Sequence, residues 1–143
     1  MILYLDTSAL VKLFVNERHS DRVREAVSGA RLIATHAIAY VEACAAFARL
    51  ANERRRKALL STLRGALDQQ WPGWEIVDVT EHMVRRAADL AGRHLLRGYD
   101  SLHLAAAQSV YEVFSGAAQF QFAVFDERLR IAAQDLSLPL LAG

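Results

Sequence analysis

The chain has 143 residues, the usual size of one domain and enough to bury about 70% of the unfolded chain's surface without disulfides. Its 17 basic and 16 acidic residues give a net charge of only +1, so no global field marks a nucleic-acid binder. The single cysteine, Cys44, excludes an intrachain disulfide and a cysteine-built zinc site. We expect one domain over residues 1–143.

Strands and helices are predicted to alternate along the chain. The expected strands are 2–6, 31–35, 75–79, 120–125 and a short one at 138–141, and the expected helices are 7–15, 19–29, 36–52, 53–70, 80–97, 99–115 and 126–135. This alternation predicts an α/β fold with a central parallel sheet flanked by helices, from which the pair at 36–70 projects as a helical hairpin. Because Asp6 and Lys12 interrupt the apolar start, which has no basic leader, we expect no signal peptide, no membrane span and a cytoplasmic protein.

The first candidate functional residue is Asp6, which ends the apolar run of residues 2–5 and precedes Thr7 and Ser8. A buried parallel strand that ends in an acid at a helix start places a carboxylate where α/β sheets bind ligands. The alternative for a single such acid is a helix cap. Asp126 repeats the pattern after the strand at 120–125, with the same alternative.

Two further isolated acids lie in apolar helices. Glu42 is the only formally charged residue between 36 and 48, so it needs a cation or a strong donor nearby, unless it lies on a narrow solvent-facing stripe with Arg49 as its partner. Asp100 opens the helix that follows Gly98, a position that the helix dipole also favours.

The four acids come from four different elements, and parallel strands bring their ends into one crevice. Four converging carboxylates repel one another, and hard divalent cations with oxygen ligands relieve that repulsion. The sequence therefore predicts a site for Mg²⁺ or Mn²⁺.

These residues resemble the PIN-domain ribonucleases, and among them the small VapC-like toxins of prokaryotic toxin–antitoxin pairs. The resemblance covers essentially the whole chain and rests on LDTSALVKL at 5–13, Glu42, RGYDSLHLAAA at 97–107 and VFDERL at 124–129. It implies a PIN-like fold, an acidic quartet of catalytic and metal-binding residues, and Ser8 as a hydroxyl that supports the metal site. The quartet is Asp6, Glu42, Asp100 and Asp126.

One position departs from the family pattern. Family members often carry Thr or Ser two residues before the fourth acid, where this chain has Val124. The departure leaves open whether Asp126 binds a metal directly or through water.

The expected activity is a metal-dependent endoribonuclease that cleaves cellular RNA by metal-activated water. Asp6 and Asp100 are expected as direct ligands, and Glu42 and Asp126 as ligands through water or at a second metal. Within the family, the alternative is an RNA-processing or quality-control nuclease that is not a toxin. A non-nuclease phosphate-signalling domain fits less well, because a receiver domain needs an acidic pair at its first strand and an aspartyl phosphatase needs an acid where Ser8 stands.

The remaining signals concern partners. The resemblance implies a homodimer and an antitoxin that directs a basic side chain at the acids, and the hydrophobic fraction of 53% indicates a surface covered by such partners. The chain has two basic clusters. For residues 54–57, a solvated helix face is preferred over an RNA contact, whereas Arg97, close to Asp100, is the candidate RNA contact. The cluster around Arg97 also holds Arg85, Arg86 and Arg93. No histidine is assigned to catalysis, and His103, one turn after Asp100, is the first to test.

Overall fold

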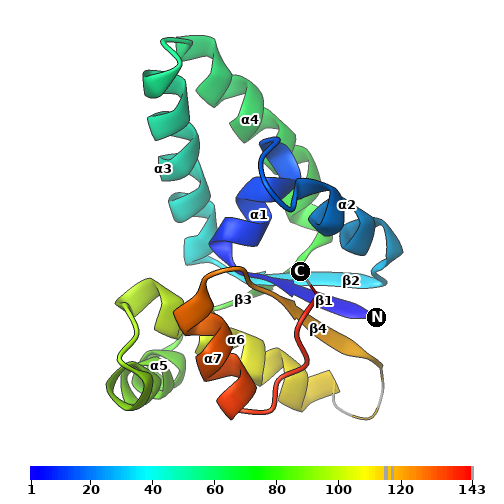
Figure 1. Ribbon diagram of the computed structural model, residues 1–143, viewed down its shortest axis with the longest axis vertical. Helices are drawn as coiled ribbons and strands as arrows, with labels where there is room; N and C mark the ends of the chain where they lie inside the picture. The colour runs from blue at the N-terminus through cyan, green and yellow to red at the C-terminus, as the bar shows by residue number, and fades with distance from the viewer. Residues whose placement is uncertain (115, 117, 143) are drawn as a thin grey trace.

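Four short parallel strands form the centre of the protein in the computed structural model, which describes residues 1–114, 116 and 118–142 (Figure 1). The sheet order is β3-β2-β1-β4, with β1 at Ile2–Leu5, β2 at Leu32–His36, β3 at Glu75–Val77 and β4 at Phe120–Ala123. Ile2 of β1 pairs with Leu32 of β2 on one side and with Phe120 of β4 on the other. The carboxyl ends of these three strands therefore meet at one edge of the sheet.

Helices cover both faces of the sheet (Figure 1). One face carries α1 at Thr7–Phe14, α2 at Ser20–Gly29, α3 at Ile38–Glu53 and α4 at Lys57–Gln70, followed by the 3₁₀ turn η1 at Trp71–Gly73. The other face carries α5 at Glu81–His94, α6 at Gly98–Phe114 and α7 at Glu127–Asp135. The α3–α4 pair projects away from the sheet as a hairpin, so the predicted α/β fold and its hairpin are confirmed.

The strand β1 lies at the centre of the core because all four of its residues are buried. Leu3 and Leu5 pack with the α1–α4 face, whereas Ile2 and Tyr4 pack with the α5–α7 face. A strand buried on both sides reads in sequence as a continuous apolar run rather than as an alternation. This is the pattern that predicted it.

Several predicted boundaries are wrong. The expected strand at 138–141 is reduced to one isolated bridge between Phe122 and Leu140, since Pro139 has no N–H to extend a ladder. Residues 54–56 form a turn, with Arg55 at a left-handed φ of 52°, so α4 begins at Lys57 rather than at residue 53. The helix expected at 80–97 ends at His94, because Leu95 adopts the left-handed conformation that ends a helix.

Smaller shifts affect other ends. The strands predicted at 75–79 and 120–125 end two residues earlier, at Val77 and Ala123. The last residue of the helix predicted at 99–115 lies outside the described residues. Among those described, no helix combines the length and hydrophobicity needed to cross a membrane.

Candidate active site

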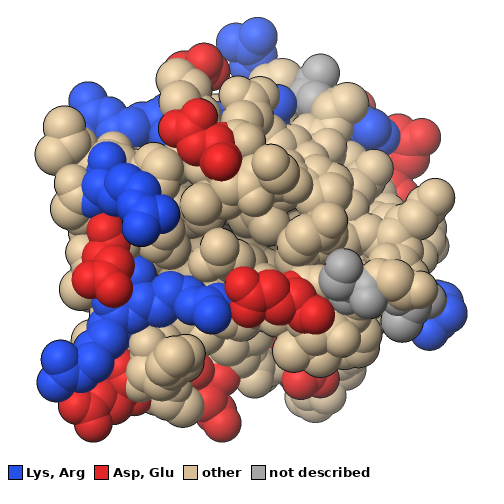
Figure 2. Space-filling view, turned by 90° about the horizontal axis from the view of Figure 1, so that it is seen from below, with Lys and Arg blue, Asp and Glu red and all other residues tan. Residues whose placement is uncertain are grey.

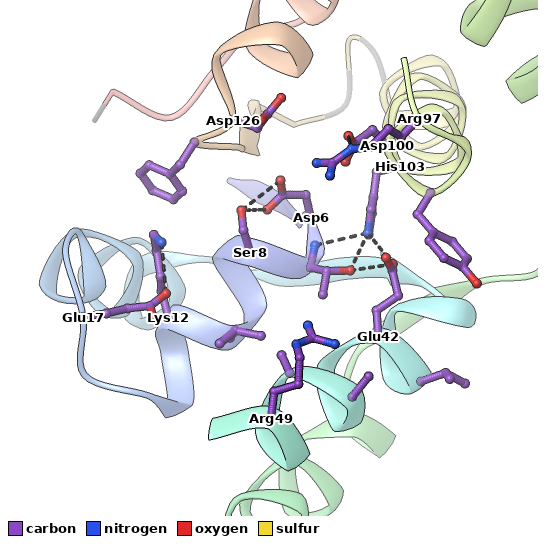
Figure 3. A pocket seen from close by; sticks show the side chains of 17 residues that line it. Asp6, Ser8, Lys12, Glu17, Glu42, Arg49, Arg97, Asp100, His103 and Asp126 are labelled. Carbon is purple, nitrogen blue, oxygen red and sulfur yellow. Dashed lines mark hydrogen bonds and ion pairs between the residues drawn. The ribbon is translucent and has the colours of Figure 1, made fainter. Parts of the chain in front are cut away.

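The four acids predicted from the sequence line one cavity of about 690 Å³ at the carboxyl edge of the sheet (Figure 3). Asp6 follows β1 and donates its backbone N–H to the Ala123 carbonyl of β4 at 3.2 Å, and Asp126 lies on the segment between β4 and α7. Glu42 comes from the second turn of α3 and Asp100 from the first turn of α6. The fold thus gathers four acids whose consecutive spacings along the chain are 26 to 58 residues.

Asp6 and Asp126 are also helix caps. Oδ1 of Asp6 accepts the backbone N–H of Ala9 at 2.7 Å, and Oδ2 of Asp126 accepts that of Leu129 at 3.0 Å. The capping interpretation and the ligand interpretation are therefore compatible, because a capping carboxylate keeps acceptor capacity on its other oxygen.

Asp6 is the most buried of the four, at 3% exposure. Burial raises the pKa of its carboxyl, and the charge of Asp100 adds to the rise, although His103, the Ala9 N–H and Ser8 act against it. Ser8 donates its hydroxyl to both carboxylate oxygens of Asp6, at 2.9 and 3.1 Å. An ionised Asp6 is therefore costly in this cavity unless a cation is nearby.

Glu42 is held by a hydroxyl, and lies beside an imidazole, rather than being paired with Arg49. The Thr7 hydroxyl donates to Oε1 of Glu42 at 2.7 Å and lies 2.7 Å from Nε2 of His103, which is itself 3.3 Å from Oε1 (Figure 3). Burial alone would raise the pKa of Glu42, but its contacts with His103 and the Thr7 hydroxyl outweigh it and leave the pKa lowered. Glu42 thus stays ionised and aimed at the cavity.

His103 joins the elements that carry three of the acids. The backbone N–H of Thr7, at the start of α1, donates to Nε2 of His103 at 3.1 Å, so the imidazole proton is assigned to Nδ1, which donates to Oη of Tyr4 at 3.1 Å. His103 is 2% exposed and lies one turn after Asp100 on α6. The ring therefore fixes α6 against β1, α1 and Glu42.

The histidines have no zinc-type spacing along the chain, yet His36, Glu42 and His103 place ligand atoms within 4.8 Å of one another. Their hydrogen bonds do not suit a metal. His36 accepts the Ile38 N–H at Nδ1 and so carries its proton on Nε2, while His103 already accepts the Thr7 N–H at Nε2. Burial, followed by the charge of His103, lowers the pKa of His36 to about 3, so its ring is neutral.

The carboxylates fit a hard cation better. Asp6, Asp100 and Glu42 face the cavity with oxygen ligands, the donor type that Mg²⁺ and Mn²⁺ prefer. Asp126 is the most exposed of the four cavity acids and lies beyond Asp6, at the rim of the cavity. Arg97, as expected from the sequence, reaches this site, where its Nε lies 3.3 Å from Oδ2 of Asp100.

Sequence reasoning missed Thr7, His36 and the use made of His103. The one available signal was the position of His103, one helical turn after Asp100 in an otherwise apolar helix. The contact from His103 to Thr7 spans 96 residues, and no local pattern encodes it.

The chain is similar to known proteins over most of its length. The model of the PIN domain family matches residues 3–133. Ribonuclease VapC45 of Mycobacterium tuberculosis is 32% identical over 133 residues, which are 92% of this chain and 89% of the relative.

Solved structures show the same fold. FitAcB from Neisseria gonorrhoeae has a TM-score of 0.71 at 20% identity, with 99% of this chain and 97% of that chain covered. VapC20 of Mycobacterium tuberculosis, a toxin that cleaves the sarcin-ricin loop, has a TM-score of 0.66 at 16% identity, with 91% and 94% covered. A toxin–antitoxin complex from Klebsiella pneumoniae has a TM-score of 0.56 at 17% identity, with 82% and 94% covered.

Proposed function

Because the chain belongs to the PIN domain family, we propose that it is a divalent-metal-dependent endoribonuclease and the toxin of a toxin–antitoxin pair. The observation that carries the proposal is the convergence of Asp6, Glu42, Asp100 and Asp126 on one cavity. The ribonuclease name of a relative at 32% identity supports the substrate class.

The acids would hold one or two Mg²⁺ or Mn²⁺ ions, since PIN nucleases generally use divalent metals. Such an ion supplies an activated water and offsets the charge that develops on the scissile phosphate. Asp6 and Asp100 are proposed as direct ligands, and Glu42 and Asp126 as ligands through water or at a second ion. Asp126 fits the second role because it is exposed at the rim.

The remaining residues orient these acids. Ser8 holds the carboxylate of Asp6 through both oxygens, and the Thr7 hydroxyl holds that of Glu42 beside His103. Arg97, 82% exposed at its side chain, can leave Asp100 and contact a phosphate of the RNA.

The role of Thr7 leads to a prediction. Thr7→Val keeps the side-chain shape but removes the donor to Glu42, so the affinity for Mn²⁺ is expected to fall by roughly 10-fold or more, the usual cost of losing a residue that orients a metal ligand. Thr7→Ser keeps the donor and should retain most of the affinity. Isothermal titration of both variants gives the comparison, and equal affinities in Thr7→Val and the unsubstituted chain would refute this role.

The proposal includes a homodimer and an inhibitory antitoxin. Large apolar side chains are exposed beside the acids, among them Val41 at 62% and Tyr99 at 57%. An apolar partner helix that crosses this surface could aim an Arg or Lys at the acids, replacing the metal's charge while it blocks the phosphate. The solved toxin–antitoxin complex from Klebsiella pneumoniae, which shares the fold, supports such a partner.

Co-expression tests the toxin assignment. Induction of the chain alone is expected to arrest growth, and induction together with the product of an adjacent small gene is expected to restore growth and yield a co-purifying complex. Light scattering of the free chain should give the mass of a dimer. Unchanged growth together with a monomer at tens of micromolar would favour the processing nuclease instead.

A further inference from the structure

A basic ridge runs along the outer part of the α3–α4 hairpin. We define it as Arg49 on α3 and the four consecutive cations at the hairpin tip, all of them exposed: Arg54, Arg55, Arg56 and Lys57. Residues 49–57 hold five cations and one acid, Glu53, so this segment carries +4 in a chain whose net charge is +1. The ridge is therefore a local concentration of positive charge in a chain that is otherwise close to neutral.

Half of the basic residues outside the ridge, six of twelve, lie within 4.0 Å of a carboxylate oxygen. On the α5 face, Arg85 pairs with Glu81 at 3.1 Å and Arg86 with Glu112 at 3.2 Å, and Figure 2, which views the molecule from this side, shows basic and acidic side chains next to one another. Within the described residues, no ridge cation has a carboxylate oxygen within 4.0 Å. Their charge is thus available to an outside anion.

The ridge is continuous with the acidic cavity. Glu42 and Arg49 line that cavity together, two helical turns and about 10 Å apart along α3. Figure 3 shows the Arg49 side chain extending toward the cavity, and Figure 1 shows the hairpin leading from the sheet edge to the tip. A strand that leaves the cavity along α3 would pass Arg49 first and the tip second.

The acids of the cavity repel the phosphates that flank the scissile one, so those phosphates need cations beside the acids. Arginine suits this role because its guanidinium binds phosphate in a bidentate way, and four of the five ridge cations are arginine. A cavity of about 690 Å³ has the size of a small-ligand site, so it has room for one nucleotide at the scissile position.

We propose that the ridge binds the sugar–phosphate backbone of a single-stranded RNA segment on one side of the scissile phosphate, a step that rests on the proposed nuclease function. The contact reads charge and not sequence, so it sets the affinity for RNA and the position of the cut relative to a strand end.

Salt-dependent binding tests the ridge. Asp6→Asn serves as the non-cleaving background, and a fluorescently labelled single-stranded RNA is titrated by anisotropy in chelator at several salt concentrations. The logarithm of the binding constant falls with the logarithm of the salt concentration, and each lost phosphate contact makes this negative slope less steep by about 0.7 for a single strand. We expect Arg49→Gln to make the slope less steep by about 0.7, and the combined Arg54→Gln, Arg55→Gln, Arg56→Gln variant by about 2.

Arg85→Gln is the matched control, an exposed arginine that already has a carboxylate partner, and its slope should not change. In the chain that retains Asp6, Arg49→Gln should raise KM for RNA and leave kcat unchanged. Shortening the RNA at one of its two ends, but not at the other, should have the same effect. Unchanged slopes with intact cleavage would overturn RNA binding by the ridge and leave the nuclease function standing. A change in oligomeric mass instead of RNA affinity would assign the ridge to a protein interface and would also overturn RNA binding by it.

Absence of RNA cleavage by the unsubstituted chain with Mn²⁺ would contradict the proposed nuclease function itself.

Discussion

Asp6→Asn is expected to reduce RNA cleavage by more than about 100-fold while the protein melts at the same or a higher temperature. Losing a residue that only supports a metal ligand typically costs 10–100-fold, so losing a ligand should cost at least as much. The raised pKa of Asp6 means that its ionised form is disfavoured in the folded protein. Without metal, the contribution of protonated Asp6 to the free energy of unfolding is present at low pH and is lost as the pH rises through that raised pKa. Asn removes this penalty and keeps the cap to Ala9, because Asn and Asp cap equally well.

Asp6→Ala is the control, since it removes the charge and the cap together and should cost about 1 kcal/mol of stability relative to Asp6→Asn. Asp100→Asn should lose cleavage as Asp6→Asn does, with little change in melting temperature, because Asp100 gives up only a pair with the exposed Arg97. Cleavage within a few-fold of the unsubstituted chain in Asp6→Asn and Asp100→Asn would remove these two acids from the active site.

A divalent cation is expected to raise the melting temperature substantially. Binding to the native state at 100 times Kd adds about 2.7 kcal/mol, which for a chain of this size is roughly 8 °C. Mn²⁺ should give this increase in the unsubstituted chain. The Asp6→Asn, Asp100→Asn double variant should show little of it, because the oxygen ligands and the repulsion that the cation relieves are both reduced.

Zn²⁺ distinguishes the carboxylates from the imidazoles. If His36 and His103 formed the metal site, Zn²⁺ would stabilise the double variant as strongly as the unsubstituted chain, since Zn²⁺ favours nitrogen ligands. A Mn²⁺ shift that survives in the double variant would likewise locate the metal away from Asp6 and Asp100.

The sequence predicted the fold and the candidate acids because their signals are local. The β1 run is apolar throughout since both faces of that strand are buried, and Asp6 and Asp126 stand at strand-to-helix junctions that any parallel sheet gathers at one edge. The isolation of Glu42 in an apolar helix correctly indicated that it needs a partner.

The partner itself could not be predicted, because it depends on packing. Thr7 and His103 meet across 96 residues, and the choice between them and Arg49 follows from how α6 lies against α1. The turn at Leu95 escaped prediction since a leucine rarely takes the left-handed conformation that glycine favours. The expected C-terminal strand does not form because Pro139 has no N–H to donate to β4. This effect could be predicted only if β4 were known to be the neighbouring strand.

Mapping of RNA ends is the decisive measurement for metal-dependent cleavage by this chain. Total RNA is incubated with the purified chain and Mn²⁺, in parallel with Asp6→Asn and with a chelator, and new ends are located by sequencing. Discrete internal cleavage sites are expected with the unsubstituted chain, and they should vanish both in Asp6→Asn and in chelator. The same sites in all three samples, or none with the unsubstituted chain, would contradict a metal-dependent endoribonuclease built on these acids.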